Sequence, residues 1–216
     1  MDGRERIYKK IRAAAKKRFT GARGSHGWEH TERVLKLAEH IARREGASLF
    51  TVKTAAVLHD IARSDEDKSS GRIDHARLGA EKAFEICVKA GLGPVEAGMI
   101  AHCVAAHRFR GRIKPVTKEA KVIFDADKLD SIGAVGIGRA FLFAGEAGAK
   151  LHNKGINISR TKPYTAEDTA YREYVVKLRN VKACMLTKEG KKMARSRHVF
   201  MEAFFKRLDK EVDGSI

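Results

Sequence analysis

Helical periodicity with few interruptions is the feature that most constrains the fold of this chain. Its 216 residues include three prolines, at positions 94, 115 and 163. The segments between them are rich in Ala, Lys, Glu and Leu, and their apolar residues recur with a period near 3.6. Elements of this kind bury their apolar stripes against one another, so the sequence predicts an all-α fold.

The spacing of apolar residues also predicts where the helices lie. In the segment 28–45, His30, Val34 and Ile41 fall on one stripe, which places His30 toward the interior. Gly46 tolerates the left-handed conformation that ends many helices. Further helices are expected at 3–20, 51–62, 74–90, 95–108, 117–130, 166–185 and 188–212, and a polar loop at 64–73.

Length and composition suit a single domain. With 43% hydrophobic residues, a chain of this length can bury a sizeable core. No apolar stretch approaches 18 residues, and the N-terminus is too charged for a signal peptide. We expect one domain over 1–216 in a soluble, cytoplasmic protein, with its core at about 24–135, a basic helix at 3–20 and a C-terminal helical extension at 150–212.

The net charge is strongly positive. Lys and Arg number 44 and Asp and Glu 27, which gives +17, and such a field attracts polyanions. The first 23 residues hold nine basic side chains and two acidic ones, while Ile7, Ile11 and Phe19 repeat near helical spacing. Two interpretations follow: a helix docked by its apolar stripe, which the sequence favours, or a surface that binds nucleic acid or another polyanion.

A histidine–aspartate pair ends an alanine-rich run. His59 and Asp60 are adjacent, His30 lies upstream, and Asp125 and Asp127 lie downstream. Adjacent residues on a helix point about 100° apart, so the pair cannot both face the core, but both can flank an ion at the helix end. Imidazole nitrogen and carboxylate oxygen together suit a divalent ion such as Mn, Mg, Co, Fe, Zn or Ni, with water as the remaining ligand and candidate nucleophile.

Either downstream aspartate can complete such a site. In the segment 117–130, Asp127 falls on the same face as Ile123 and Phe124, and a carboxylate among apolar residues needs a binding partner. Asp125 falls on a different face. Periodicity thus favours Asp127 slightly and leaves Asp125 open.

These motifs resemble those of the HD-domain metal-dependent phosphohydrolases. The segment 28–34 is similar to the family's first histidine motif, 56–61 to its central pair, and 125–133 to its final aspartate motif. Segments 74–81, 136–141 and 185–201 resemble a subgroup of small, single-domain microbial members, so the resemblance covers most of the chain.

The resemblance implies an HD-domain helical bundle with a defined set of metal ligands. In the family motif the aspartate precedes a basic residue and a leucine, which selects Asp127. The implied ligands are His30, His59, Asp60 and Asp127.

Three further histidines are candidates for the site. His75 lies in a pattern that resembles the third histidine of members with extra metal or phosphate contacts, and we expect it and His102 to bind phosphate or a second ion. For His107 two roles are possible, a place in the site or packing in the core, and core packing is favoured. Related proteins with two ions often carry two adjacent histidines, but Cys103 follows His102 here. This departure argues against a firmly bound second ion.

Hydrolysis of a phosphate ester also needs side chains that neutralise the charge of the phosphate and a group that transfers a proton. Lys128 and Arg63 are candidates for binding phosphate, with a solvated surface base as the alternative for each. Some HD nucleotidases carry an acidic residue, which acts in proton transfer, at the position of Arg63. That mechanism is therefore not expected here, and Asp130 or Asp65 is expected to orient the water instead. We assign catalysis to Asp60, Asp130 and Lys128, and phosphate binding to His75, His102, Lys128 and Arg63.

The resemblance implies hydrolysis of a nucleotide or related phosphate ester or anhydride by metal-activated water. A nucleoside triphosphate, a monophosphate or a guanosine tetraphosphate-like alarmone would each fit. The main alternative is a basic nucleic-acid-binding protein with a structural metal site. Its weakness is the absence of a recognisable binding module and an aromatic content of 7% for base stacking. A third reading is an oxygenase with a diiron centre, which Cys103 after His102 disfavours.

Overall fold

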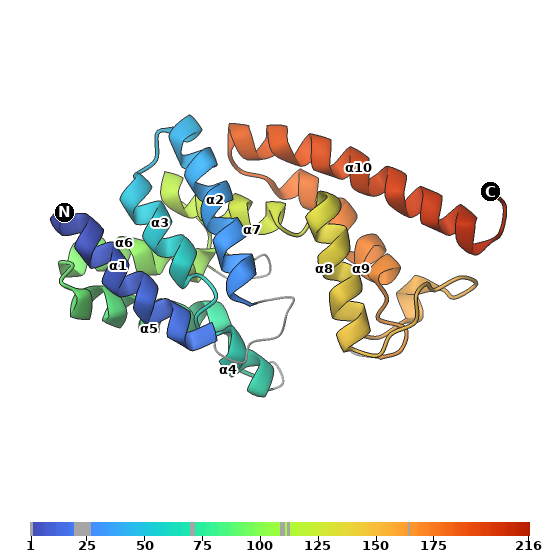
Figure 1. Cartoon of the computed structure of the whole chain (residues 1–216), viewed down its shortest axis with the longest axis horizontal. Helices are drawn as coiled ribbons and strands as arrows, with labels where there is room; N and C mark the ends of the chain where they lie inside the picture. Colours follow the sequence, from blue (N-terminus) through green and yellow to red (C-terminus); the bar gives the residue numbers. More distant parts are fainter. Residues whose placement is uncertain (1, 20–26, 70–71, 109–110, 112, 164) are drawn as a thin grey trace. The chain divides into compact units, whose positions relative to one another are not determined.

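The computed structural model describes residues 2–19, 27–69, 72–108, 111, 113–163 and 165–216 (Figure 1). Within these ranges all regular structure is helical and no strand occurs, so the predicted all-α fold is confirmed. No helix in the same ranges combines the length and the apolar character that crossing a bilayer requires.

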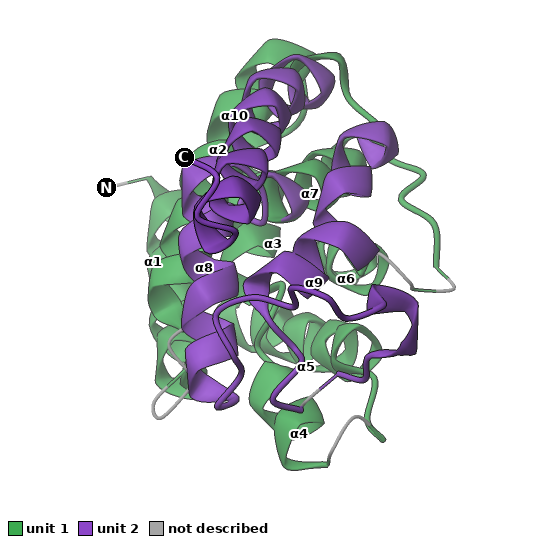
Figure 2. Cartoon of the chain, turned by 90° about the vertical axis from the view of Figure 1, so that its right-hand side faces the viewer, with its two compact units in different colours: residues 1–127, 186–189 green, residues 128–185, 190–216 purple. Residues whose placement is uncertain are grey.

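The chain divides into two compact units (Figure 2). The first comprises residues 1–127 and 186–189, and the second comprises residues 128–185 and 190–216. A single domain over residues 1–216 stays a prediction, because two compact units can belong to one folding domain.

The first unit is built from seven helices of the described ranges, the last of which continues into the second unit. They are α1 (Gly3–Lys16), followed by the 3-10 turn η1 (Lys17–Phe19), α2 (Trp28–Glu45), α3 (Leu49–Leu58), α4 (Arg63–Lys68), α5 (His75–Ala90), α6 (Pro94–Ala106) and α7 (Lys118–Leu129). Helix α3 packs against α1, α2 and α6. Its residues 55–58 have no exposed surface, as expected for a helix that is apolar all round.

The ends of these helices follow from local capping. Helix α2 ends as predicted, because Gly46 adopts a left-handed conformation with φ of 64°. Helix α3 begins two residues earlier than expected because Ser48 caps it, its side chain accepting a hydrogen bond from the Thr51 N–H. It ends at Leu58, four residues earlier than expected, so His59 and the residues after it lie in a turn.

Helix α1 docks on the first unit by its apolar stripe. Tyr8, Ile11 and Ala15 are buried, and the helix contacts α3 and α5. The Arg12 guanidinium lies over the ring of Trp28, 5.7 Å from its centroid. This arrangement fits the interpretation of a docked helix, and it leaves most of the basic side chains of α1 exposed.

The second unit contains α8 (Gly133–Glu146), the 3-10 turns η3 (Ile158–Arg160) and η4 (Leu178–Cys184), α9 (Ala170–Val176) and most of α10 (Lys188–Val212). The helix expected over 166–185 is instead α9 followed by η4, because Lys177, with φ of −138° and ψ of −58°, leaves the helical conformation. The loop expected over 64–73 contains α4.

Candidate metal centre

Six histidine and aspartate side chains of the first unit converge, and most of them come from helix ends. They are His30 in the first turn of α2, His59 and Asp60 directly after α3, His75 at the start of α5, His107 directly after α6, and Asp127 in α7. All but Asp127 are buried, and the Asp127 side chain is 19% exposed.

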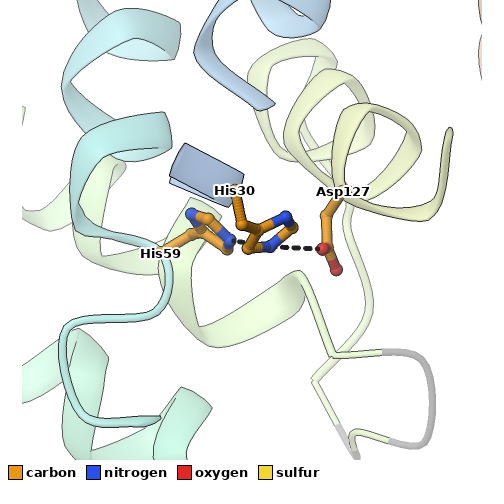
Figure 3. Close-up of side chains that lie close together, drawn as sticks. All are labelled: His30, His59 and Asp127. Atoms are coloured by element: carbon orange, nitrogen blue, oxygen red, sulfur yellow. Dashed lines mark hydrogen bonds and ion pairs between the residues drawn. The ribbon is translucent and has the colours of Figure 1, made fainter. Parts of the chain in front are cut away.

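His30, His59 and Asp127 form one group (Figure 3). The Nε2 atoms of His30 and His59 are 3.2 Å apart, and Nε2 of His30 is 3.4 Å from Oδ1 of Asp127. One ligand atom from each residue lies within 4.8 Å of the others, a separation at which all three can contact a common ion. The structure therefore brings together three of the four residues predicted as metal ligands.

Asp60, His75 and His107 form a second group. Oδ1 of Asp60 is 3.5 Å from Nε2 of His75 and 3.4 Å from Nε2 of His107. The two Nε2 atoms are 3.3 Å from each other.

Asp60 connects the two groups. Its other oxygen, Oδ2, is 3.6 Å from Nε2 of His59 and 3.7 Å from Nε2 of His30. One carboxylate oxygen thus faces the first group and the other faces the second, so Asp60 can serve as a ligand in both.

Helix ends fix the orientation of two of these imidazoles. The last carbonyl groups of a helix lack intrahelical partners. The residue directly after α3 is His59, whose Nδ1 donates to the Ala56 carbonyl at 2.8 Å. Directly after α6, Nδ1 of His107 donates to the Val104 carbonyl at 2.6 Å. Because a carbonyl only accepts, Nδ1 carries the proton, and in the neutral rings the Nε2 lone pair faces the groups.

The charge states suit metal binding. Burial lowers the pKa of His59 to about 4 and also lowers the pKa of His75, so both rings are neutral near pH 7. Burial alone would raise the pKa of Asp60, but the surrounding imidazoles hold it well below its ordinary value. The second group therefore offers an ionised Asp60 carboxylate beside the neutral imidazole of His75.

A divalent cation fits this donor set. Imidazole nitrogens and carboxylate oxygens face one another across 3.2 to 3.7 Å, an arrangement that needs a proton or a cation between the facing atoms. Mixed nitrogen and oxygen ligands of this kind suit Mn, Fe, Co or Zn.

Four other predicted site residues lie outside both groups. Asp130 is buried in the second unit, where its carboxylate accepts a hydrogen bond from Arg139 at 3.0 Å. Lys128 is buried and also belongs to the second unit. Arg63 pairs with Glu66 at 3.2 Å. His102 is half-buried, and its Nε2 has no hydrogen-bond partner among the described residues. The roles of these residues stay predictions.

Asp125 has a different environment from Asp127. It is buried, and it accepts hydrogen bonds from the Leu186 N–H at 2.9 Å, the Thr187 N–H at 2.8 Å and the Thr187 hydroxyl at 2.6 Å. Burial raises its pKa despite these bonds. Asp125 thus fastens the segment 186–189 to α7, and the structure places Asp127, not Asp125, beside His30.

Sequence reasoning left His107 outside the assigned site, although the structure places it beside His75 and Asp60. A pattern could have pointed to it, because His59 and His107 each follow directly on an alanine-rich, apolar helix. The same reasoning overlooked Glu66, whose carboxylate contacts His75.

Comparison with known proteins identifies the family. The model of the family described as HD domain matches residues 27–132, which contain all six converging side chains. An uncharacterized protein of Bacillus subtilis (strain 168), YpgQ, is 35% identical over 208 residues, which cover 94% of this chain and 93% of that protein. The chain belongs to the HD domain family. The family membership that the motifs predicted and the predicted HD helical bundle are both confirmed.

Solved structures agree with this assignment. The structure of Bacillus subtilis YpgQ in complex with ADP has a TM-score of 0.75 and 31% identity, covering 97% of each chain. That of an HD-superfamily hydrolase from Bacillus thuringiensis has a TM-score of 0.74 and 27% identity, covering 98% of this chain and 99% of the other. The chain therefore has the fold of the HD-superfamily hydrolases.

Proposed function

We propose that this protein is a cytoplasmic, metal-dependent phosphohydrolase that acts on a nucleotide or a related phosphate ester or anhydride. The observation that carries the proposal is the convergence of four imidazoles and two carboxylates, five of them buried, within the segment that matches the HD domain family. The ADP bound by the Bacillus subtilis relative supports a nucleotide as the substrate.

The residues divide into two ligand sets. His30, His59, Asp60 and Asp127 would hold one divalent ion, and Asp60, His75 and His107 can hold a second. A bound divalent ion lowers the pKa of its water ligand and neutralises charge on phosphoryl oxygens.

The protein contributes preorganisation and access. The Nδ1 hydrogen bonds of His59 and His107 hold their rings without help from a ligand, which avoids reorganisation of the imidazoles when a cation binds. In the first group Asp127 is the most exposed residue, so we infer that the phosphate approaches from its side. Lys128, Arg63 and His102 stay predicted phosphate contacts, and Asp130 or Asp65 stays the group predicted to orient the water.

Metal-dependent turnover tests this function. Purified protein is treated with a chelator, reloaded separately with Mn, Co or Mg, and assayed for phosphate and pyrophosphate release from nucleoside tri-, di- and monophosphates. We expect activity that the chelator removes and at least one of these ions restores.

Two variants serve as the matched comparison. His59→Ala should abolish turnover, whereas His40→Ala, which changes an exposed histidine paired with Glu189, should not. Turnover that persists after chelation, or a fully active His59→Ala variant, would contradict the proposal.

A further inference from the structure

His75 differs from His59 and His107 in the part of its helix that it occupies. It is the first residue of α5, after the N-cap Asp74. A helix N-terminus has N–H groups without intrahelical partners, whereas the carbonyl groups without such partners lie at the C-terminus. The backbone acceptor that orients His59 and His107 is therefore lacking at this end of a helix, and Nδ1 of His75 needs an acceptor from elsewhere.

Glu66 in α4 provides that acceptor. Its Oε2 accepts a hydrogen bond from Nδ1 of His75, and the carboxylate is buried. Because a carboxylate only accepts, this contact places the proton on Nδ1 and directs the Nε2 lone pair of His75 toward Asp60 and His107.

Arg108 holds Glu66 in this position. Its Nη2 donates to Oε1 of Glu66 at 3.0 Å, and its Nη1 is 2.9 Å from Oδ1 of Asp74. Since Asp74 caps α5 and Arg108 follows His107, this side chain ties α4, the start of α5 and the end of α6 together. The fork geometry of a guanidinium suits two such contacts at once.

We propose that Glu66 is a positioning residue of the second group, one that keeps His75 in the tautomer able to bind a cation. Arg108 supports it by fixing the carboxylate. The expected effect of Glu66 on ion binding rests on the proposed function, because it requires a cation at Asp60, His75 and His107. The expected effect of Glu66 on the tautomer of His75 does not depend on that function.

Two substitutions separate positioning from a purely structural ion pair. Glu66→Met keeps a side chain of similar shape and removes the acceptor, whereas Arg108→Met breaks the same ion pair and retains the acceptor. Asp67→Asn, which changes an exposed acid one residue further along α4, is the control for loss of charge.

The first measurement is the 15N NMR spectrum of the imidazoles in chelator-treated protein at pH 8, where histidines are neutral. In the wild type, Arg108→Met and Asp67→Asn, His75 should carry its proton on Nδ1. In Glu66→Met a substantial fraction should shift to Nε2. An unchanged tautomer in Glu66→Met, or a wild-type His75 protonated on Nε2, would overturn the proposal, and the wild-type result decides even if the variant does not fold.

The second measurement is titration of the chelator-treated proteins with Mn. Loss of a hydrogen-bond partner of a metal ligand typically weakens metal affinity about 10- to 100-fold. We expect such a loss for the second ion in Glu66→Met, with the first ion unchanged and Asp67→Asn like the wild type. Equal Mn affinities in Glu66→Met and wild type would overturn the positioning role of Glu66. A wild type that binds no second ion would instead refute the second ligand set of the proposed function. The role of Glu66 would then be decided by the NMR measurement of the His75 tautomer.

Discussion

The two groups that share Asp60 differ in exposure. In the first group, the Asp127 side chain is 19% exposed, whereas every residue of the second group is buried. A ligand can therefore reach the first group more directly than the second.

The two groups also differ in how their histidines are oriented. His59 and His107 use backbone carbonyls of their own helices, but His75 depends on a carboxylate from another helix. The orientation of the histidines in the second group therefore depends more on tertiary contacts than that of His59 in the first group.

Among the substitutions that compare the two groups, the largest effect is expected for Asp60, because its two oxygens face both groups. Asp60→Asn should lower turnover by more than the roughly 100-fold upper value typical of hydrogen-bond partners of metal ligands, and should weaken binding at both groups. Metal analysis and initial rates check this. Loss of one ion with the other retained at full affinity would show that Asp60 serves a single group.

A smaller effect, confined to the second group, is expected for His107. His107→Ala should lower the affinity for the second ion and the turnover, while His102→Ala should mainly lower stability, typically by about 0.5 to 3 kcal/mol. Metal content, melting temperature and rate per folded molecule separate the two. If His102→Ala instead loses turnover while His107→Ala retains it, the role predicted for His102 from the sequence would be upheld.

Substitutions of Asp125 and Asp127 should affect different properties, the first the stability of the fold and the second the affinity for the first ion. Asp125→Ala leaves the Leu186 and Thr187 donors without this acceptor, at a cost of about 1 to 3 kcal/mol for each buried donor left unsatisfied. It should bind the first ion normally when folded. Asp127→Ala should show the opposite pattern, in denaturation and in metal titration. The same metal affinity in both variants would contradict the assignment of Asp127.

The smallest effect is expected from salt. Exposed charges are screened over about 10 Å at 0.1 M ionic strength, so added salt should reduce nucleotide turnover modestly. Binding of RNA or DNA with a steep dependence of log affinity on log salt would show that several phosphates are engaged at once. That result would favour the nucleic-acid-binding alternative.

The sequence predicted the features that depend on local pattern. The helical stripe placed His30 inward, Gly46 ended α2, and the pair His59-Asp60 marked the end of an apolar helix. The choice of Asp127 over Asp125 came mainly from the resemblance to the family, since periodicity separated the two only slightly.

The second group was predicted only in part, as Asp60 and His75, because the places of His107 and Glu66 depend on contacts between distant segments. Glu66 lies in a polar stretch that has no apolar stripe, so α4 was expected to be a loop. Its contact with His75, and the place of His107 beside both, arise from the packing of α4, α5 and α6, which no single stretch of sequence records.

Anomalous diffraction from crystals soaked in Mn tests the central claim most directly, because it locates ions independently of activity. We expect a peak contacted by His30, His59, Asp60 and Asp127, and at higher Mn concentration a second peak contacted by Asp60, His75 and His107. Absence of Mn from the first position in active protein would show that these four residues do not form the metal site.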